Sequence, residues 1–344
     1  MAVDITAVPT DAGKRHVTHN VANVAAWMSA FVVCFIGATC TREPAAPLFA
    51  LRQIGPKTWA AIDDPTATRR SGANAGFVIG DDAVLVIDTF DNVDAAKQLL
   101  AHIHSLTSLP IRFAINTHHH PDHVGGNGVF AQAGAVVLAH RNVRRWIHTE
   151  NLRSATEGMR SIGSEITPEQ RAVIEGLVPP TLVYDRAVDL YLGAREVQVR
   201  SFPGHTGGDS IVLIPDAKVV FCGDLLWRDI LPTLNDASTE PWVETLQTLA
   251  TSEPGATFVP GHGDLSHARD VTALWSYLMT LRNLVATAQA QGKSGDALAN
   301  AVIPMLAEQY GQWRFFKEMV KPNVLQTDAE LRGTKRIPHA EPGT

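Results

Sequence analysis

Three histidines, an aspartate and a fourth histidine follow one another almost without interruption in the segment HHHPDH. In an extended chain, side chains alternate between the two faces, so His118 and His120 point the same way while His119 points the other way. The proline then ends the extended run, and Asp122 and His123 can begin a helix directed at a second ion. Imidazole and carboxylate groups are the ligands that zinc and related metals prefer. The segment therefore predicts a metal site.

Three further candidate ligands stand where predicted strands run out into loops. His205 lies in FPGHTGG, Asp224 ends KVVFCGD, and His262 lies in VPGHG. Taken singly, each would be an ordinary loop histidine or a turn-forming aspartate. Their shared placement at equivalent strand ends favours a single ligand set, and the neighbouring glycines let the backbone approach an ion closely.

The elements that must position these residues alternate between strand-like and helix-like patterns after about residue 45. Strands are predicted over 76–80, 83–88, 111–117, 135–139, 196–202, 210–214, 218–222 and 257–259. Helical patterns cover 93–104, 124–133, a polar insertion from about 142 to 171, and 268 to about 319. Two segments resemble each other: FVIGDDAVLVID, which ends at Asp88, and IVLIPDAKVVFCGD, which ends at Asp224. The repeat suggests two related halves, each with a sheet and covering helices.

The combined pattern resembles the metallo-β-lactamase superfamily. Its HxHxDH signature is matched by His118, His120, Asp122 and His123, and the flanking runs NTHHHPDHVGGN, PGHTGGDS, CGDLLW and VPGHG are also similar. The likeness extends from about Leu48 to His267. It implies an α/β fold, the four-layer αββα sandwich with two sheets face to face, followed here by C-terminal helices. The metal site would lie along one edge of the sandwich.

The resemblance also implies a role for each ligand. The first metal would be held by His118, His120 and His205, the second by Asp122, His123 and His262, and Asp224 would bridge the two. Asp88 matches a buried aspartate that orders the ligand loop from behind the site, although it could instead cap the turn before the next helix. The implied cofactor is a pair of divalent metal ions, with zinc favoured over iron or manganese.

The function this implies is a metal-dependent, di-zinc hydrolase that cleaves an ester, thioester, lactone or amide bond with a metal-bound hydroxide. Asp122 and Asp224 would be its catalytic carboxylates. One alternative is a β-lactam-hydrolysing metallo-β-lactamase, but those enzymes carry cysteine or serine in place of Asp224, which resembles the glyoxalase II-like branch instead. Another alternative is a mononuclear iron sulfur dioxygenase, which keeps much of the same ligand set.

Two residues are candidates for determining substrate specificity. Trp227 and Arg228 follow the bridging aspartate closely and could line a pocket, where the guanidinium could hold a carboxylate; ordinary packing and a solvated arginine are the alternative. Cys222 lies in an apolar run and is expected to be a small buried side chain. A formal net charge of -6 argues against a nucleic-acid partner and leaves a small molecule as the expected ligand.

The N-terminal region differs from the rest in composition. Lys14, Arg15 and His16 precede the uncharged run 21–40, the pattern of a signal peptide or of a membrane anchor. Residues 1–44 are therefore expected to direct export to the periplasm or the outside, or to attach the protein to a membrane through residues 21–40. Residues 45–320 would form the catalytic domain, and residues 321–344 a loose tail.

Overall fold

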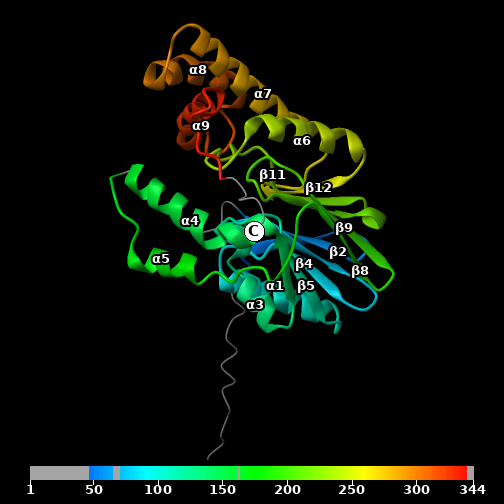
Figure 1. The fold of residues 1–344 in the computed structure, drawn as a ribbon. Coiled ribbons are helices and arrows are strands. Elements are labelled where there is room, and N and C mark those ends of the chain that lie inside the picture. The colour runs from blue at the N-terminus through cyan, green and yellow to red at the C-terminus, as the bar shows by residue number, and fades with distance from the viewer. Residues whose placement is uncertain (1–45, 65–69, 162, 339–344) are drawn as a thin grey trace, which may run out of the picture. The chain divides into compact units, whose positions relative to one another are not determined.

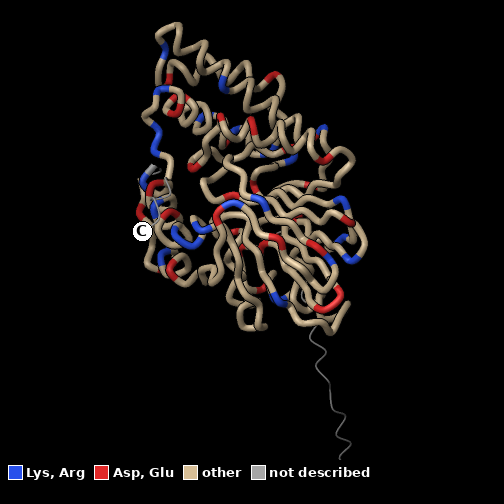
Figure 2. The backbone as a smooth tube through the Cα atoms, turned by 45° about the vertical axis from the view of Figure 1, so that its right-hand side comes forward, with Lys and Arg blue, Asp and Glu red and all other residues tan. Residues whose placement is uncertain are grey.

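The computed structural model describes residues 46–64, 70–161 and 163–338. The leader expected at residues 1–44 lies outside these described residues. None of the helices in the described part of the chain is long and apolar enough to cross a membrane. Acidic and basic residues are interspersed along this part of the chain (Figure 2).

The first sheet has seven strands in sequence order, β1 to β7. Its first four strands are antiparallel, whereas β4, β5, β6 and β7 are parallel to one another. The strands are β1 (Phe49–Gly55), β2 (Thr58–Asp63), β3 (Ala75–Ile79), β4 (Val84–Ile87), β5 (Ile111–Asn116), β6 (Val136–His140) and β7 (Leu182–Tyr184). Short apolar runs such as VLVI in β4 are buried on both faces, as expected for strands covered on both sides.

The second sheet has five strands in the order β12-β11-β10-β9-β8. Only β11 and β12 run parallel; the other neighbours are antiparallel. The strands are β8 (Ala187–Leu192), β9 (Arg195–Ser201), β10 (Ser210–Ile214), β11 (Val219–Trp227) and β12 (Thr257–His262). The hairpin β3–β4 of the first sheet thus has its counterpart in β10–β11, and the predicted similarity of the two halves is seen in their topology.

The two sheets pack face to face and helices cover both outer faces (Figure 1). Side chains from both sheets, such as Leu85 and Ile115 from the first and Val199 and Phe221 from the second, form one core between them. A second core lies between the first sheet and α1, and a third between the second sheet and the C-terminal helices. The predicted αββα sandwich with C-terminal helices is therefore confirmed.

The helices that flank the sheets are α1 (Val93–Leu106), α2 (Pro121–Val124), α3 (Asn127–Gln132), α4 (Arg141–Ser161), α5 (Pro168–Glu175), α6 (Thr239–Ser252), α7 (Ala268–Ala290), α8 (Gly295–Tyr310) and α9 (Phe316–Leu331). The expected loose tail from residue 321 is wrong for its first part, because α9 continues to Leu331. Val320 and Val324 lie one turn apart and pack into the core against α7 and α8, which keeps this stretch helical despite Pro322. Beyond α9, residues 334–338 return toward α4 (Figure 1).

Candidate metal centre

The seven candidate ligands all lie at one edge of the sandwich, where strands end. The loop after β5 carries the histidine-rich segment, and α2 begins at Pro121 directly behind it. His205 follows β9, Asp224 lies within β11, and His262 is the last residue of β12. In the first sheet β4 and β5 are parallel neighbours, and in the second sheet β11 and β12 are. The carboxyl ends of the two strands in each pair therefore lie at the same edge of their sheet.

A first group of ligand atoms comes from His118, His120, His205 and Asp224. Nδ1 of His120 lies 3.1 Å from Nε2 of His118 and 3.0 Å from Nε2 of His205. Oδ2 of Asp224 lies 3.3 Å from Nε2 of His205 and 3.7 Å from Nε2 of His118. Three imidazole nitrogens and one carboxylate oxygen thus converge on a single point.

A second group comes from Asp122, His123 and His262. Oδ2 of Asp122 lies 3.3 Å from Nε2 of His262 and 3.8 Å from Nε2 of His123. The other oxygen of Asp224, Oδ1, lies 3.1 Å from Nε2 of His123 and 3.3 Å from Nε2 of His262. Asp224 therefore directs one oxygen at each group.

The arrangement fits divalent metal ions on two observations. Zinc–nitrogen and zinc–oxygen bonds of about 2.0–2.2 Å at tetrahedral angles place ligand atoms roughly 3.3 Å apart, close to the spacings in both groups. In addition, Nε2 of His123, Nε2 of His262 and Oδ1 of Asp224 are buried and have no hydrogen-bond partner among the described residues. Buried polar atoms without partners destabilise a fold unless something satisfies them, and a metal ion would.

Hydrogen bonds behind the ligands fix which nitrogen faces the centre. Asp88 is buried, accepts from the Thr117 backbone N–H and hydroxyl at 2.8 Å each, and lies 2.8 Å from Nδ1 of His123. With the proton of His123 on Nδ1, Nε2 is left as an acceptor for metal. Asn92, not Asp88, caps α1. The structure thus puts Asp88 behind the ligands, as the resemblance implies.

Asp236 is a further buried residue behind the ligands, and the sequence pattern gave no signal for it. Its Oδ2 lies 3.1 Å from Nε2 of His120, the ring nitrogen opposite the one that faces the first group. Its Oδ1 accepts from Nη2 of Arg153 in α4 at 2.5 Å. In the sequence Asp236 stands shortly before α6, where an aspartate would be interpreted as a helix cap.

An ion-pair network continues from Arg153 to the C-terminal segment. The guanidinium of Arg153 also contacts Glu150 and Glu157 of α4 at 2.6 Å each. Glu150 in turn accepts from both terminal nitrogens of Arg336, at 2.9 and 3.1 Å. The orientation of His120 is therefore linked, through Asp236, to α4 and to residues 334–338.

Burial and neighbouring charges act in opposite directions on the ligands. Burial would raise the pKa of Asp224, but the surrounding imidazoles of His262, His123 and His118 hold it well below its usual value. Burial lowers the pKa of His205 to about 3. Asp224 is thus an anion and His205 a neutral imidazole at neutral pH, the protonation states in which these groups bind metals.

Two glycines let the backbone of β11 and β12 come close enough for Asp224 to be shared. A Cβ on Gly261 would lie 1.9 Å from Oδ1 of Asp224. Gly223 has a φ of +50°, and a Cβ there would meet the hydroxyl of Thr117 at 2.3 Å. Neither position accommodates a side chain without displacing a group of the site.

The two expected pocket residues are placed differently. The ring of Trp227 packs on that of His262, with centroids 4.1 Å apart, so it forms part of the wall of the site. Arg228 instead donates to the Leu265 carbonyl and lies 3.9 Å from Asp270 of α7. The prediction that Arg228 holds a substrate carboxylate is not supported, because its guanidinium is directed at the connection between β12 and α7. Cys222 is buried as expected, and burial raises the pKa of its thiol.

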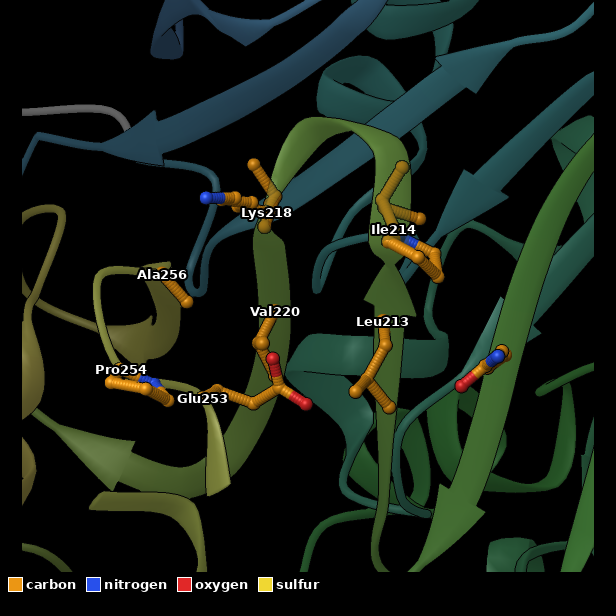
Figure 3. A pocket seen from close by; sticks show the side chains of 10 residues that line it. Leu213, Ile214, Lys218, Val220, Glu253, Pro254 and Ala256 are labelled. Carbon is orange, nitrogen blue, oxygen red and sulfur yellow. The ribbon is translucent and has the colours of Figure 1, made fainter. Parts of the chain in front are cut away.

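A hollow of about 260 Å³ lies at the opposite end of β11 from the metal centre. Figure 3 shows Lys218 and Val220 of the start of this strand beside Leu213, Glu253 and Ala256. None of the candidate ligands lines this hollow. The hollow is therefore separate from the group of candidate ligands.

Comparisons with known proteins agree with this geometry. A family profile described as "Metallo-beta-lactamase superfamily" matches residues 68–262. The chain is 28% identical over 157 residues to the "Probable metallo-hydrolase YqgX" of Bacillus subtilis, covering 45% of this chain and 67% of that protein. Over 119 residues it is 33% identical to the "Hydroxyacylglutathione hydrolase" of Brucella ovis, covering 33% of this chain and 34% of that protein.

The chain is also similar to a "Linear primary-alkylsulfatase" of a Pseudomonas species, at 21% identity over 217 residues; the match covers 55% of this chain and 41% of the alkylsulfatase. The chain thus spans less than half the length of two of these three relatives. Among solved structures, a "Metallo-beta-lactamase from Pontibacter korlensis" has a TM-score of 0.52 at 20% identity, covering 67% of this chain and 99% of that one. That similarity concerns the fold.

Proposed function

The chain belongs to the metallo-beta-lactamase superfamily and is a metallo-hydrolase, and from that premise we propose that it holds two divalent metal ions, preferably zinc, and cleaves a carbonyl ester, thioester, lactone or amide. The observation that carries the proposal is the position of Asp224, whose two oxygens face two separate groups of histidines. Metal ions bound there would supply Lewis acidity, which activates water and polarises a carbonyl near neutral pH.

The protein's own residues complete the chemistry. Asp122 is the most exposed of the ligand side chains, at 30%, whereas Asp224 is 2% exposed. Asp122 is therefore the carboxylate that can reach both the solvent and a bound substrate, and we assign it to orient the attacking water and hold its proton. When the acyl bond breaks, that proton would go to the leaving oxygen, sulfur or nitrogen. Asp122, His120 and His262 have exposed side-chain fractions of 30%, 16% and 12%, so a substrate would approach the centre from their side. Trp227, packed on His262, would shield one side of the centre from water.

Relatives of the chain support an acyl bond as the target, since one is named a hydroxyacylglutathione hydrolase. A second candidate is a sulfate ester, favoured only by the similarity to the alkylsulfatase. The test is a substrate panel for the zinc-loaded protein: an aryl ester, a thioester, a lactone, an anilide, a β-lactam and an alkyl sulfate. We expect turnover of one or more of the first four. Turnover of the β-lactam or the alkyl sulfate alone would replace the proposal.

The sulfur dioxygenase alternative is separated by a different measurement. Oxygen uptake with a persulfide substrate by the iron-loaded protein, without hydrolysis of any ester by the zinc-loaded protein, would assign the chain to that reaction class. We expect no oxygen uptake.

A further inference from the structure

The turn that carries Asp236 is braced by the C-terminal segment. The turn runs from Leu234 to Ala237, whose backbone N–H donates to the Leu234 carbonyl at 3.3 Å. The ammonium of Lys335 donates to the carbonyls of both residues, at 2.6 Å each. One side chain from beyond α9 thus holds both ends of the turn, and Asp236 lies between them.

Lys335 can brace the turn because it is both buried and charged. Its side chain is 2% exposed, and a carboxylate oxygen of Glu330 lies 3.9 Å from its nitrogen. Burial lowers its pKa to about 8, so the ammonium is present at neutral pH. Hydrogen bonds from a charged donor are stronger than those between neutral groups. Replacing Lys335 by an apolar residue would therefore remove two strong bonds from the turn.

The same turn supports two histidines of the first ligand group. Oδ2 of Asp236 lies 3.1 Å from Nε2 of His120. Ser238, directly after the turn, donates its backbone N–H to the Gly204 carbonyl at 2.8 Å, and Gly204 precedes His205 in the chain. The turn therefore contacts one ligand through a side chain and the loop of another through its backbone.

Two further residues of the C-terminal segment act on the same group. Arg336 is connected to Asp236 through the ion pairs on α4 described above. A Cβ on Gly207 would lie 3.5 Å from the Pro338 carbonyl oxygen, so the backbone of the segment comes within van der Waals distance of the loop that carries His205. Residues 334–338 thus contact the surroundings of the first group at three places.

The second ligand group is supported by a different part of the chain. Nδ1 of His123 contacts Asp88, which is held by the backbone and hydroxyl of Thr117. Within the described part of the chain, none of the side-chain hydrogen bonds of residues 334–338 reaches a ligand of this group. The two groups therefore differ in what holds them in place.

We propose that residues 334–338, which we call the C-terminal clasp, position the ligands of the first metal and not those of the second, with Lys335 as the main positioning residue. The proposal rests on the two-metal centre of the proposed function. Without the clasp the turn loosens, Asp236 no longer fixes the ring of His120, and the first group loses affinity for metal while the second group keeps its affinity.

The experiment measures Co²⁺ affinity of the full-length protein at pH 7 by competition with a chelator, one ligand group at a time. His262→Ala leaves the first group complete, and His205→Ala leaves the second. In the His262→Ala background, Lys335→Met should weaken Co²⁺ binding by about tenfold, the lower end of the range for residues behind metal ligands. It should also change the visible absorption of Co²⁺, which reports the ligand geometry. In the His205→Ala background the affinity should change by less than about twofold.

Two more variants complete the design. Lys321→Met is the matched control, since Lys321 is an exposed lysine of α9 that pairs with Asp296 at 2.8 Å. Arg336→Ala changes a side chain that is 57% exposed and leaves the core intact, and it should show the same selectivity with a smaller loss.

Unchanged Co²⁺ binding by Lys335→Met in the His262→Ala background, or equal weakening in both backgrounds, would overturn the proposal. The affinity of the second group also shows whether each variant is folded. If the wild-type protein binds one ion, at the first group, and Lys335→Met weakens its binding about tenfold, the clasp is retained and the proposed two-metal reaction fails.

Discussion

Oδ2 of Asp236 lies 3.1 Å from Nε2 of His120, 116 residues away in the chain, on the side of the ring opposite the nitrogen that faces His118 and His205. Carboxylates behind metal-binding histidines orient the ring and strengthen its basicity. This contact makes Asp236, together with Arg153, a positioning element for the first group of candidate ligands.

Replacing Asp236 by Ala should therefore weaken the first metal site by roughly ten- to a hundredfold, the usual effect of removing such a partner. Asp236→Asn, which keeps an acceptor oxygen, should retain more affinity. Competition with a chelator for Co²⁺, followed by absorbance, measures this directly. Asp216→Ala is a control, since Asp216 is an exposed partner of Arg195. Equal affinities for the Ala and control variants would show that the contact plays no positioning role.

Asp224→Ala should lower both the affinity for metal and the hydrolytic turnover by at least about a hundredfold, because each of the two ligand groups loses one oxygen. This is a larger effect than removing a residue that only orients a ligand. Asp82→Ala is the comparison. Asp82 is exposed in the turn between β3 and β4 and pairs with Arg112 at 3.1 Å, and an exposed ion pair contributes about 0–1 kcal/mol. Similar losses in the two variants would mean that the ligand set is misassigned.

Gly261→Ala should abolish metal binding, because the added Cβ would lie 1.9 Å from Oδ1 of Asp224. Gly128→Ala in α3 is the matched control, with its nearest contact at 3.4 Å, an ordinary van der Waals distance. Elemental analysis of both purified variants tests this. Full metal content in Gly261→Ala would contradict the close approach of β11 and β12.

Lys335 provides a pH-dependent prediction for stability. Burial lowers its pKa from 10.5 to about 8, so between these values the unfolded chain binds more protons than the folded one. The unfolding free energy of the wild type, relative to that of Lys335→Met, should therefore rise as the pH increases from about 8 to 10.5. This increase in stability is absent at pH values below about 8. Urea titrations at pH 7.5, 9 and 10.5 measure the unfolding free energy of both proteins, and the difference between them is compared across the three pH values. A difference that stays constant or falls over this range would be inconsistent with the buried ammonium.

The sequence was most informative where the chemistry is local. Four ligands lie within His118 to His123, and the glycines beside His205, Asp224 and His262 mark the other three. The alternating apolar runs also predicted most strands of both sheets. These signals depend on spacing along the chain, so no knowledge of distant contacts was needed.

Long-range contacts explain what the sequence did not predict. Asp236 reaches His120 only in the folded chain, and the helical continuation of α9 past Pro322 depends on packing of Val320 and Val324 against α7 and α8. The strands β1 and β2 were not predicted from the sequence. β1 is an edge strand of the first sheet, and TWAAID in β2 becomes a strand through pairing with β1 and β3. The two alternatives for Arg228, a pocket residue or ordinary packing, could not be separated from the sequence, because proximity to Asp224 along the chain does not indicate the direction of its side chain.

The most direct test of the account is the number of metal ions per chain. The purified full-length protein, saturated with zinc and freed of unbound metal by gel filtration, is analysed by inductively coupled plasma mass spectrometry. Because Asp224 directs one oxygen at each of two groups of histidines, we expect two zinc ions per chain. One ion at saturation, or none, would contradict the two-metal centre on which the proposed hydrolysis depends.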